Sequence, residues 1–299
     1  MAWLVTASGA LLVLVILRDV FHTLWHPTRH GGLSRLVMRT VWRVSAHRGS
    51  RRRPAGLAGP LGMVAVVAVW ALTVAVGWAL VYWPHMPDDF SYASGLAPGE
   101  HASPVDALYV SLVTLATLGL GDIAPATGWP RVLAPMEALV GFVLLSATVA
   151  WILGVHPALA RRRTLALRLS HLRRSATTTR SLDSGGGAAM LDGLASGLAT
   201  VDFMQYAESY YFHDADEHTA LPRQLGYALG LAARAAEADH PDVRLSASVL
   251  DRALDDLAGV LDERFLRTGG GPGQDFAAFA LDHGQPWETD GPPAARGRG

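Results

Sequence analysis

The run from Leu61 to Trp83 constrains the fold of this chain more than any other stretch. It carries no charged side chain over 23 residues, which is long enough for an α-helix to cross a hydrocarbon layer of roughly 30 Å. A helix satisfies all of its backbone hydrogen bonds within one such segment. Trp78, Tyr82 and Trp83 gather at its end, as aromatic side chains do at a membrane interface. The sequence therefore predicts a membrane span here.

Two further apolar runs indicate that the chain crosses the membrane more than once. Residues 2–25 and 132–154 are both long enough to span. The first run has too little charge before it, and no small-residue cleavage pattern after it, for a signal peptide. There is no cysteine, so neither disulfides nor a cysteine-ligated zinc site is available. We expect an all-α membrane protein with three transmembrane helices and a soluble C-terminal part.

A loop that contains glycines separates the second and third runs. In it, Thr117, Gly119 and Gly121 alternate with leucines, and glycine reaches backbone conformations closed to residues with a Cβ. Such a strand can direct successive carbonyls to one axis, where they replace the water around a dehydrated cation. Residues 104–116 before it are expected to form a short helix, with Asp106 near its start. The pattern favours a re-entrant helix followed by a filter strand.

The stretch from Ala107 to Asp122 resembles the pore loop of potassium channels, whose usual filter is T-V-G-Y-G-D. The resemblance covers roughly residues 61–154 and implies a two-helix pore unit, with K⁺ as the permeant ion passing in single file. It implies ion sites made by backbone carbonyls and the threonine hydroxyl, and an outer mouth beyond them. The residues concerned are Thr117, Leu118, Gly119, Leu120 and Gly121, followed by Asp122 at the outer mouth. The simpler alternative is a re-entrant or extracellular loop that conducts nothing.

One chain supplies one filter strand, whereas a carbonyl cage needs four around a common axis, so the resemblance implies a homotetramer. Leu120 stands where most of the family has tyrosine, as in the second pore loops of some two-pore-domain potassium channels. Leucine cannot offer the phenol hydroxyl that ties the filter to the pore helices, and Ala116 removes another hydroxyl. We expect a more pliable filter, with weaker discrimination between K⁺ and Na⁺ or easier inactivation.

Two residues of the third run have candidate roles near this filter. Glu137 is a carboxylate inside an apolar span, which is unfavourable unless it is paired or protonated. It either braces the pore helix from behind the filter, against Thr114 or Ser111, or extends to the outer interface. Gly141 lies where two-span potassium channels place a hinge glycine. It either serves as that hinge or allows close helix packing.

The arginines are segregated along the chain. Residues 26–60 carry eight and residues 161–174 carry six, with no acidic residue in either block. The positive-inside rule places both blocks in the cytoplasm, which puts the N-terminus and the mouth of the loop outside the cell membrane. Leu33–His47 is expected to be a helix on an anionic leaflet, so anionic membrane lipids are predicted partners. Tethering by a span at each end argues against nucleic acid as a partner.

Three ionisable residues, Arg18, Asp19 and His22, lie near the end of the first run. Asp19 and His22 are three residues apart and share a helix face. They either make a polar contact with a neighbouring helix or act as a gating sensor, or they only compensate neighbouring charge at the membrane interface. The interfacial interpretation is the simpler one.

Beyond residue 160 the chain is rich in Ala and Leu. We expect a glycine-rich hinge at 180–187 and helices near 157–175, 187–212, 220–238 and 241–267. No G-x-G-x-x-G loop follows a strand pattern, which argues against a nucleotide-binding regulatory fold. The parts that we expect are a first transmembrane helix at 1–26, a basic segment at 27–60, a pore domain at 61–154, a cytoplasmic helical regulatory domain at 155–268 and a disordered tail at 269–299.

A dense group of ionisable side chains falls inside the regulatory domain. Oxygen and imidazole ligands at this density suit a divalent cation or a proton sensor. The group lacks the glycine of a calcium loop and matches no zinc spacing, and an exposed turn that caps the next helix has the same composition. Its members are His213, Asp214, Asp216, Glu217 and His218.

The sequence thus predicts a tetrameric potassium-selective channel that conducts K⁺ passively. Gating is assigned to movement of the cytoplasmic domain, driven by an unidentified ligand, by lipid or by protons, because no span carries the regularly spaced arginines of a voltage sensor. We expect no cofactor, and no nucleophile–base pair or phosphate loop indicates an enzyme. Two alternatives are a weakly selective cation channel and a membrane-anchored receptor or scaffold with a non-conducting pore fold.

Overall fold

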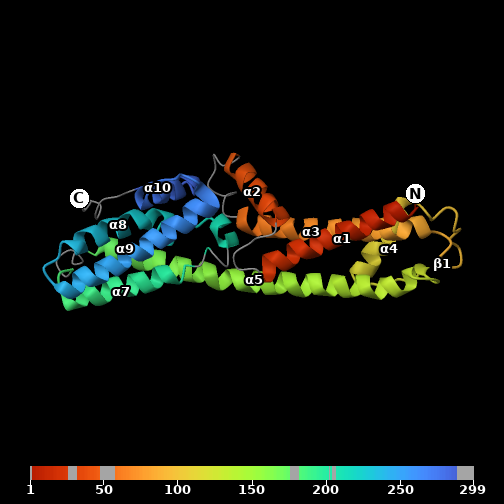
Figure 1. Cartoon of the computed structure of the whole chain (residues 1–299), viewed down its shortest axis with the longest axis horizontal. Helices are drawn as coiled ribbons and strands as arrows, with labels where there is room; N and C mark the ends of the chain where they lie inside the picture. The colour runs from red at the N-terminus through yellow and green to blue at the C-terminus, as the bar shows by residue number, and fades with distance from the viewer. Residues whose placement is uncertain are drawn as a thin grey trace, which may run out of the picture. The chain divides into compact units, whose positions relative to one another are not determined.

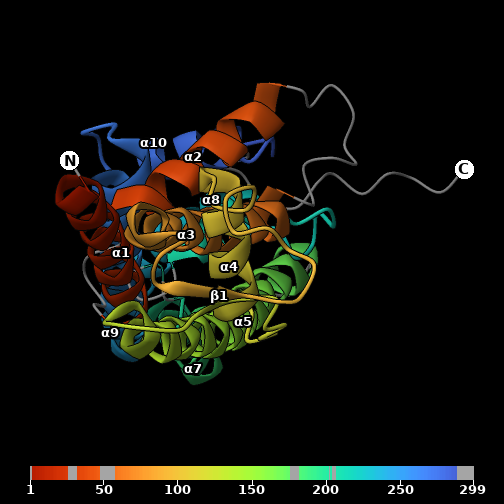
Figure 2. The ribbon, with the colours of Figure 1, turned by 90° about the vertical axis from the view of Figure 1, so that its right-hand side faces the viewer.

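The computed structural model describes residues 2–25, 32–47, 58–175, 182–201, 203 and 207–287. The chain divides into two compact units, Met1–Val44 with Pro60–Leu153, and Ser45–Gly59 with Gly154–Gly299. Within the described ranges the regular secondary structure is helical apart from one two-stranded sheet (Figures 1 and 2). This confirms the predicted all-α class.

Three helices in the described part of the chain are long and apolar enough to cross a membrane, as predicted. They are α1 (Ala2–Trp25), α3 (Ala58–Tyr82), which continues into the 3₁₀ turn η2 (Trp83–His85), and α5 (Pro130–Arg174). The helices expected at 132–154 and 157–175 are therefore one helix, because neither Gly154 nor Pro157 interrupts it.

Between α3 and α5 the first unit contains a short helix and a small sheet. α4 (Pro104–Leu115) begins with a capping box, in which the side chains of Ser103 and Asp106 each accept a hydrogen bond from the other residue's backbone N–H. β1 (Phe90–Tyr92) pairs antiparallel with β2 (Ile123–Pro125). The sheet thus joins the segments before and after α4. Figure 2 shows α4 between α3 and α5.

α2 (Gly32–His47) is the helix expected for the basic segment. It buries Ser34, Met38 and Trp42, which recur every fourth residue and so share one face. A Cβ on Gly62 would lie 2.7 Å from the sulfur of Met38, so this face packs closely on the start of α3. Figure 1 shows α2 leaving α1 and α3 at an angle. The remaining arginines of the basic block lie outside the described residues, at positions 29, 48, 51, 52 and 53.

The second unit is built from several helices and a core of aromatic side chains. α9 packs against α7, α8 and α10. Within the core, the ring of Tyr210 stacks on that of Phe265 with centroids 4.0 Å apart. The elements after α5 are α7 (Gly185–Ala199), η3 (Ala207–Tyr211), α8 (Leu221–Ala236), α9 (Pro241–Leu261), the π-helical turn η4 (Asp262–Leu266) and α10 (Pro272–Asp282).

Three predictions for this unit are wrong. The tail expected to be disordered from residue 269 contains α10, because Phe276 and Phe279 lie one turn apart and are fully buried. The hinge or linker expected at 180–187 does not include its glycines, which begin α7, where the side chain of Ser184 accepts a hydrogen bond from the N–H of Gly187. The helix expected to reach residue 212 ends at Ala199.

Candidate functional site

The loop after α4 has an alternating backbone conformation. Thr117, Gly119 and Gly121 have φ angles of 58°, 57° and 76°, in the left-handed region, and the two leucines between them do not. Alternating handedness places successive N–H groups on one side of a chain and the carbonyls on the other. A β-branched residue with positive φ is a genuine outlier, and such strain concentrates at functional sites. The backbone of the loop thus alternates in handedness over residues 117–121.

The start of this loop is fixed by hydrogen bonds to the end of α4. The N–H groups of Thr117 and Leu118 donate to the carbonyls of Thr114 and Val113, each over 2.9 Å. The N–H of Gly119 also donates to the Val113 carbonyl, over 3.4 Å. The N–H groups at the start of the loop are therefore satisfied by α4, which holds the strand at a defined place relative to that helix.

Asp122 ends the loop and is tied to α4 by a side-chain contact. The hydroxyl of Tyr109 donates to Oδ2 of Asp122 over 2.6 Å. This hydrogen bond lowers the pKa of Asp122 and raises the pKa of Tyr109 from their ordinary values. The Asp122 carbonyl also accepts from the N–H of Ala93 over 2.7 Å, beside the small sheet. The sequence did not identify Tyr109 as a site residue. Tyr109 lies within a helical run, where no local pattern indicates which side chain contacts a residue beyond the end of the helix.

Glu137 of α5 is completely buried and joins this helix to α3 and α4. Its carboxylate accepts a hydrogen bond from Ser111 of α4 over 2.5 Å and another from Tyr82 of α3 over 2.7 Å. Thr114, the other partner that the sequence offered, donates to the carbonyl of Val110 in its own helix. Tyr82 was missed because an aromatic residue at the end of a span is typical of a membrane interface.

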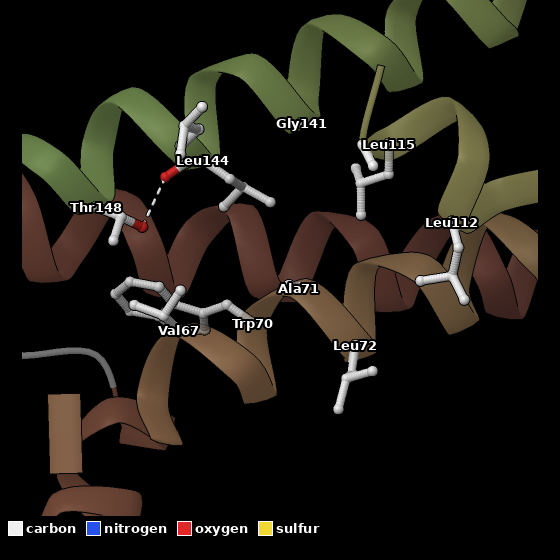
Figure 3. A pocket seen from close by; sticks show the side chains of 11 residues that line it. Val67, Trp70, Ala71, Leu72, Leu112, Leu115, Gly141, Leu144 and Thr148 are labelled. Carbon is white, nitrogen blue, oxygen red and sulfur yellow. Dashed lines mark hydrogen bonds between the residues drawn. The ribbon is translucent and has the colours of Figure 1, made fainter. Parts of the chain in front are cut away.

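Gly141 allows α5 to approach the end of α4. A Cβ at this position would overlap the carbonyl oxygen of Leu115, which favours the close-packing alternative over a hinge. The same region lines an apolar pocket of about 290 Å³ between α3, α4 and α5 (Figure 3). The hydroxyl of Thr148 in its wall donates to the Leu144 carbonyl over 2.8 Å, so this group is satisfied within α5. Other residues lining the pocket include Val67, Trp70, Ala71, Leu112, Leu115 and Ala116.

Asp19 makes a polar contact with neighbouring helices, so the simpler interfacial interpretation of this residue is wrong. Its carboxylate is buried and accepts a hydrogen bond from the indole N–H of Trp70 on α3 over 2.9 Å. His22, expected to act with it, instead receives a hydrogen bond from Arg18 over 3.4 Å. The first turn of α2 and Trp70 of α3 both bond to Asp19.

The ionisable group of residues 213–218 does not converge on one point. Asp214 is buried and pairs with Arg162 over 2.6 Å and with Arg163 over 2.7 Å. Glu217 pairs with Arg223. Two of its carboxylates are therefore held by arginines, which makes them unsuited to bind a cation.

The other members of this group also have local partners. Oδ1 of Asp216 accepts from the backbone N–H of His218 over 3.0 Å, and the ring of His218 lies 3.0 Å from the hydroxyl of Ser170. Burial lowers the pKa of His213 from its ordinary value, which moves it away from the physiological range of a proton sensor. Among the described residues, no three potential ligands stand close enough to hold a metal ion. The structure therefore does not support the divalent-cation interpretation.

Comparison with known proteins places the loop within a recognised family. The sequence profile of a family described as "Ion channel" matches residues 63–155, which include the glycine loop, Glu137 and Gly141. The chain is 47% identical over 53 residues to "Two-pore potassium channel 5" of Arabidopsis thaliana, covering 16% of this chain and 13% of that protein. It is 35% identical over 79 residues to "Two pore potassium channel c" of Oryza sativa subsp. japonica, covering 25% and 16%.

A bacterial relative matches over a longer stretch. The chain is 27% identical over 169 residues to "Uncharacterized membrane protein YdjJ" of Bacillus subtilis (strain 168), covering 55% of this chain. It spans about half of that protein, at 48%, and less of the two plant channels. No solved structure matches the chain significantly. The chain is therefore a membrane protein whose residues 63–155 match an ion-channel family and are similar, over shorter stretches, to two plant potassium channels.

Proposed function

We propose that the chain is the subunit of a channel that conducts K⁺ passively through the backbone carbonyls of residues 117–120. The observation that supports this most is the alternation of left-handed residues directly after a short helix between two spans. Such a strand supplies a row of carbonyl dipoles that substitutes for the hydration shell of a cation. The names of the two plant relatives, both potassium channels, favour K⁺ as the ion.

We propose that four copies surround one axis, because each chain has a single filter strand. In one chain Leu118 and Leu120 are 65% and 62% exposed, although both are large and apolar. Exposed apolar side chains also continue along α5. Lipid tails are as apolar as these side chains, so the single filter strand, and not this surface, carries the proposal. The side chains on α5 include Met136, Leu139, Phe142 and Leu145.

Potassium flux from liposomes tests this function. Gly119→Ala and Gly128→Ala are a matched pair, because these glycines have φ angles of 57° and 62° but only Gly119 lies in the filter strand. We expect flux in the wild type and in Gly128→Ala, and its loss in Gly119→Ala. Equal flux from Gly119→Ala would exclude residues 117–120 as the ion path. A folded, assembled wild type without flux would favour a receptor or scaffold with a non-conducting pore fold.

The degree of selectivity is a separate proposal. Leu120 offers no hydroxyl, and the bond from Tyr109 to Asp122 ties the outer mouth to α4 instead. We expect K⁺ to be preferred over Na⁺, with a preference that increases in Leu120→Tyr. Bi-ionic reversal potentials measure this directly. A strong preference for K⁺ that Leu120→Tyr leaves unchanged would exclude the pliable filter, whereas equal permeation by Na⁺ would favour the weakly selective channel.

Orientation and gating complete the proposal. We propose that the N-terminus lies outside the cell membrane and the second unit in the cytoplasm, as the arginine blocks favour. The chain has no cysteine, so labelling of Leu281→Cys with an impermeant thiol reagent tests the location of α10. A ligand acting on the second unit would reach the pore through α5, which carries residues of both units. Unchanged flux after deletion of residues 183–299 would exclude this gating.

A further inference from the structure

Asp19 of α1 provides the N-terminal cap of another helix. Its Oδ1 accepts from the backbone N–H of Leu33 over 3.1 Å, and its Oδ2 accepts from the N–H of Ser34 over 3.3 Å. These N–H groups belong to the first turn of α2 and have no acceptor within that helix. The hydroxyls of Thr23 and Ser34 lie 3.0 Å apart and add a second tie. A carboxylate at this place also opposes the positive end of the helix dipole.

The same carboxylate connects α2 to the helices of the pore. It accepts from the indole N–H of Trp70, and the Trp70 ring lies 5.7 Å from that of Trp151 on α5. Both tryptophans are buried. Trp70 also lines the apolar pocket that extends to Leu115, and Figure 3 shows its ring at the end of the pocket near Thr148. A continuous path of bonded and packed groups thus leads from the start of α2 to α5, which is called the inner helix below.

Away from its buried face, α2 presents two adjoining rows. Arg35, Arg39 and Arg43 follow one another at a spacing of four residues, so they share one side of the helix. Beside them, Leu36 and Val44 are 61% and 46% exposed. Basic side chains next to exposed apolar ones are typical of a helix that places its apolar row among acyl chains and its cations among phosphates.

We propose that α2 is a binding site for anionic lipid headgroups, and that Asp19 transmits the occupancy of this site to the inner helix through Trp70 and Trp151. A lipid fits better than a free anion because the arginine row adjoins an exposed apolar row on a helix fastened to two membrane spans. Asp19 is a positioning residue, since it touches neither the headgroup nor the permeant ion. The transmission rests on the proposed channel function, whereas the lipid site does not.

Fluorescence tests the lipid site without any requirement for conduction. Leu36→Cys introduces a single thiol for a polarity-sensitive label, because the chain has no cysteine. We compare the full chain in vesicles of phosphatidylcholine with the full chain in mixed vesicles that also contain phosphatidylglycerol. We expect the label to enter a less polar environment only in the mixed vesicles. Leu281→Cys, on a helix of the second unit, is the control site and should not respond.

The arginine variants determine whether headgroup charge is responsible. Changing Arg35, Arg39 and Arg43 to Gln should weaken the response to phosphatidylglycerol by about fivefold for each guanidinium removed, whereas Lys at the same positions should preserve it. No response at Leu36→Cys, or a full response in the triple Gln variant, overturns the lipid site. The same response to inorganic phosphate added to phosphatidylcholine vesicles overturns the choice of a lipid.

Potassium flux tests the transmission. In the wild type we expect flux to depend on phosphatidylglycerol, and in Asp19→Asn we expect this dependence to be lost while the Leu36→Cys label still responds. If Asp19→Asn does not assemble, Trp70→Phe removes the indole donor together with part of the ring and should have the same effect. Full lipid dependence in the variant that assembles overturns the transmission. A wild type that binds lipid but conducts no K⁺ contradicts the proposed function and the transmission, and leaves the lipid site intact.

Discussion

Two buried carboxylates connect the helices of the first unit in different ways. Glu137 accepts hydrogen bonds from two hydroxyls, those of Ser111 and Tyr82. Asp19 accepts from two backbone N–H groups and an indole N–H. A hydroxyl can donate or accept, whereas amide and indole N–H groups only donate. The hydroxyls around Glu137 can therefore also accept a hydrogen bond from a substituted side chain, whereas the N–H groups around Asp19 require an acceptor.

The two carboxylates also join different parts of the unit. Glu137 connects α3, α4 and α5, and Asp19 connects α1 and α2 to α3. The first contact belongs to the family-matched segment of residues 63–155. The second attaches elements that lie outside it. A pore unit and its attached helices are thus fastened by chemically distinct contacts, which substitutions can separate.

The largest effect on stability is expected for Asp19→Asn. The new amide points an N–H group at groups that only donate, so at least one buried donor loses its acceptor. The free energy of unfolding should fall by about 1–3 kcal/mol, measured by thermal unfolding in detergent. Asp88→Asn is the matched control, because Asp88 is exposed and its substitution should change stability by less than about 0.5 kcal/mol. Equal stability of the two variants would contradict the need for an acceptor.

An amide should be tolerated better at position 137 than at position 19. Glu137→Gln keeps a carbonyl acceptor and adds an NH₂ group, from which a hydroxyl oxygen can accept a hydrogen bond. It should therefore lower the free energy of unfolding by less than about 1 kcal/mol. Glu137→Leu removes both functions and should cost about 1–2 kcal/mol. The comparison with Asp19 fails if Glu137→Gln is as destabilising as Asp19→Asn.

A smaller effect is expected for Tyr82→Phe. It removes one of the two hydrogen bonds to Glu137 and leaves the bond from Ser111 in place. The expected loss is about 0.5–1.5 kcal/mol. When Tyr82→Phe is added to Glu137→Leu, it should lower the free energy of unfolding by less, because in that background the Tyr82 hydroxyl has no carboxylate to bind. Equal losses in both backgrounds would show that Tyr82 acts independently of Glu137.

The smallest effect is expected outside the spans, at Tyr109→Phe. The Tyr109 hydroxyl lowers the pKa of Asp122, so the contribution of this bond is present above the ordinary pKa of the carboxyl and is lost as pH falls through the lowered value. Without the hydroxyl, the pKa of Asp122 should rise toward its ordinary value. The acidic decline of flux should then move to higher pH, and Tyr92→Phe should not move it. Superimposable profiles for wild type and Tyr109→Phe would exclude a role for this bond.

Local patterns in the sequence predicted the spans and the filter loop, because length, charge and glycine spacing act within a few residues. The sequence offered Ser111 and Thr114 as partners of Glu137, because a carboxylate beside a short helix reaches only the face of that helix that is turned toward it. The structure contains the contact with Ser111. Tyr82 and Trp70 could not be identified in this way, because their partners lie 55 and 51 residues away in the chain. The helix at 272–282 was missed because glycine and proline around it outweighed its two buried phenylalanines. The ion-binding role of residues 117–121 is still a prediction.

The ratio of K⁺ to Na⁺ flux in Glu137→Leu and Asp19→Asn tests the distinction between the two carboxylates most directly. Both variants are measured in vesicles that contain phosphatidylglycerol, next to the wild type. We predict that the ratio falls in Glu137→Leu, because α4, which leads into the proposed filter, loses its bond to α5, and stays at the wild-type value in Asp19→Asn. A ratio unchanged in Glu137→Leu, or lowered equally in both variants, would contradict the separate roles of these residues.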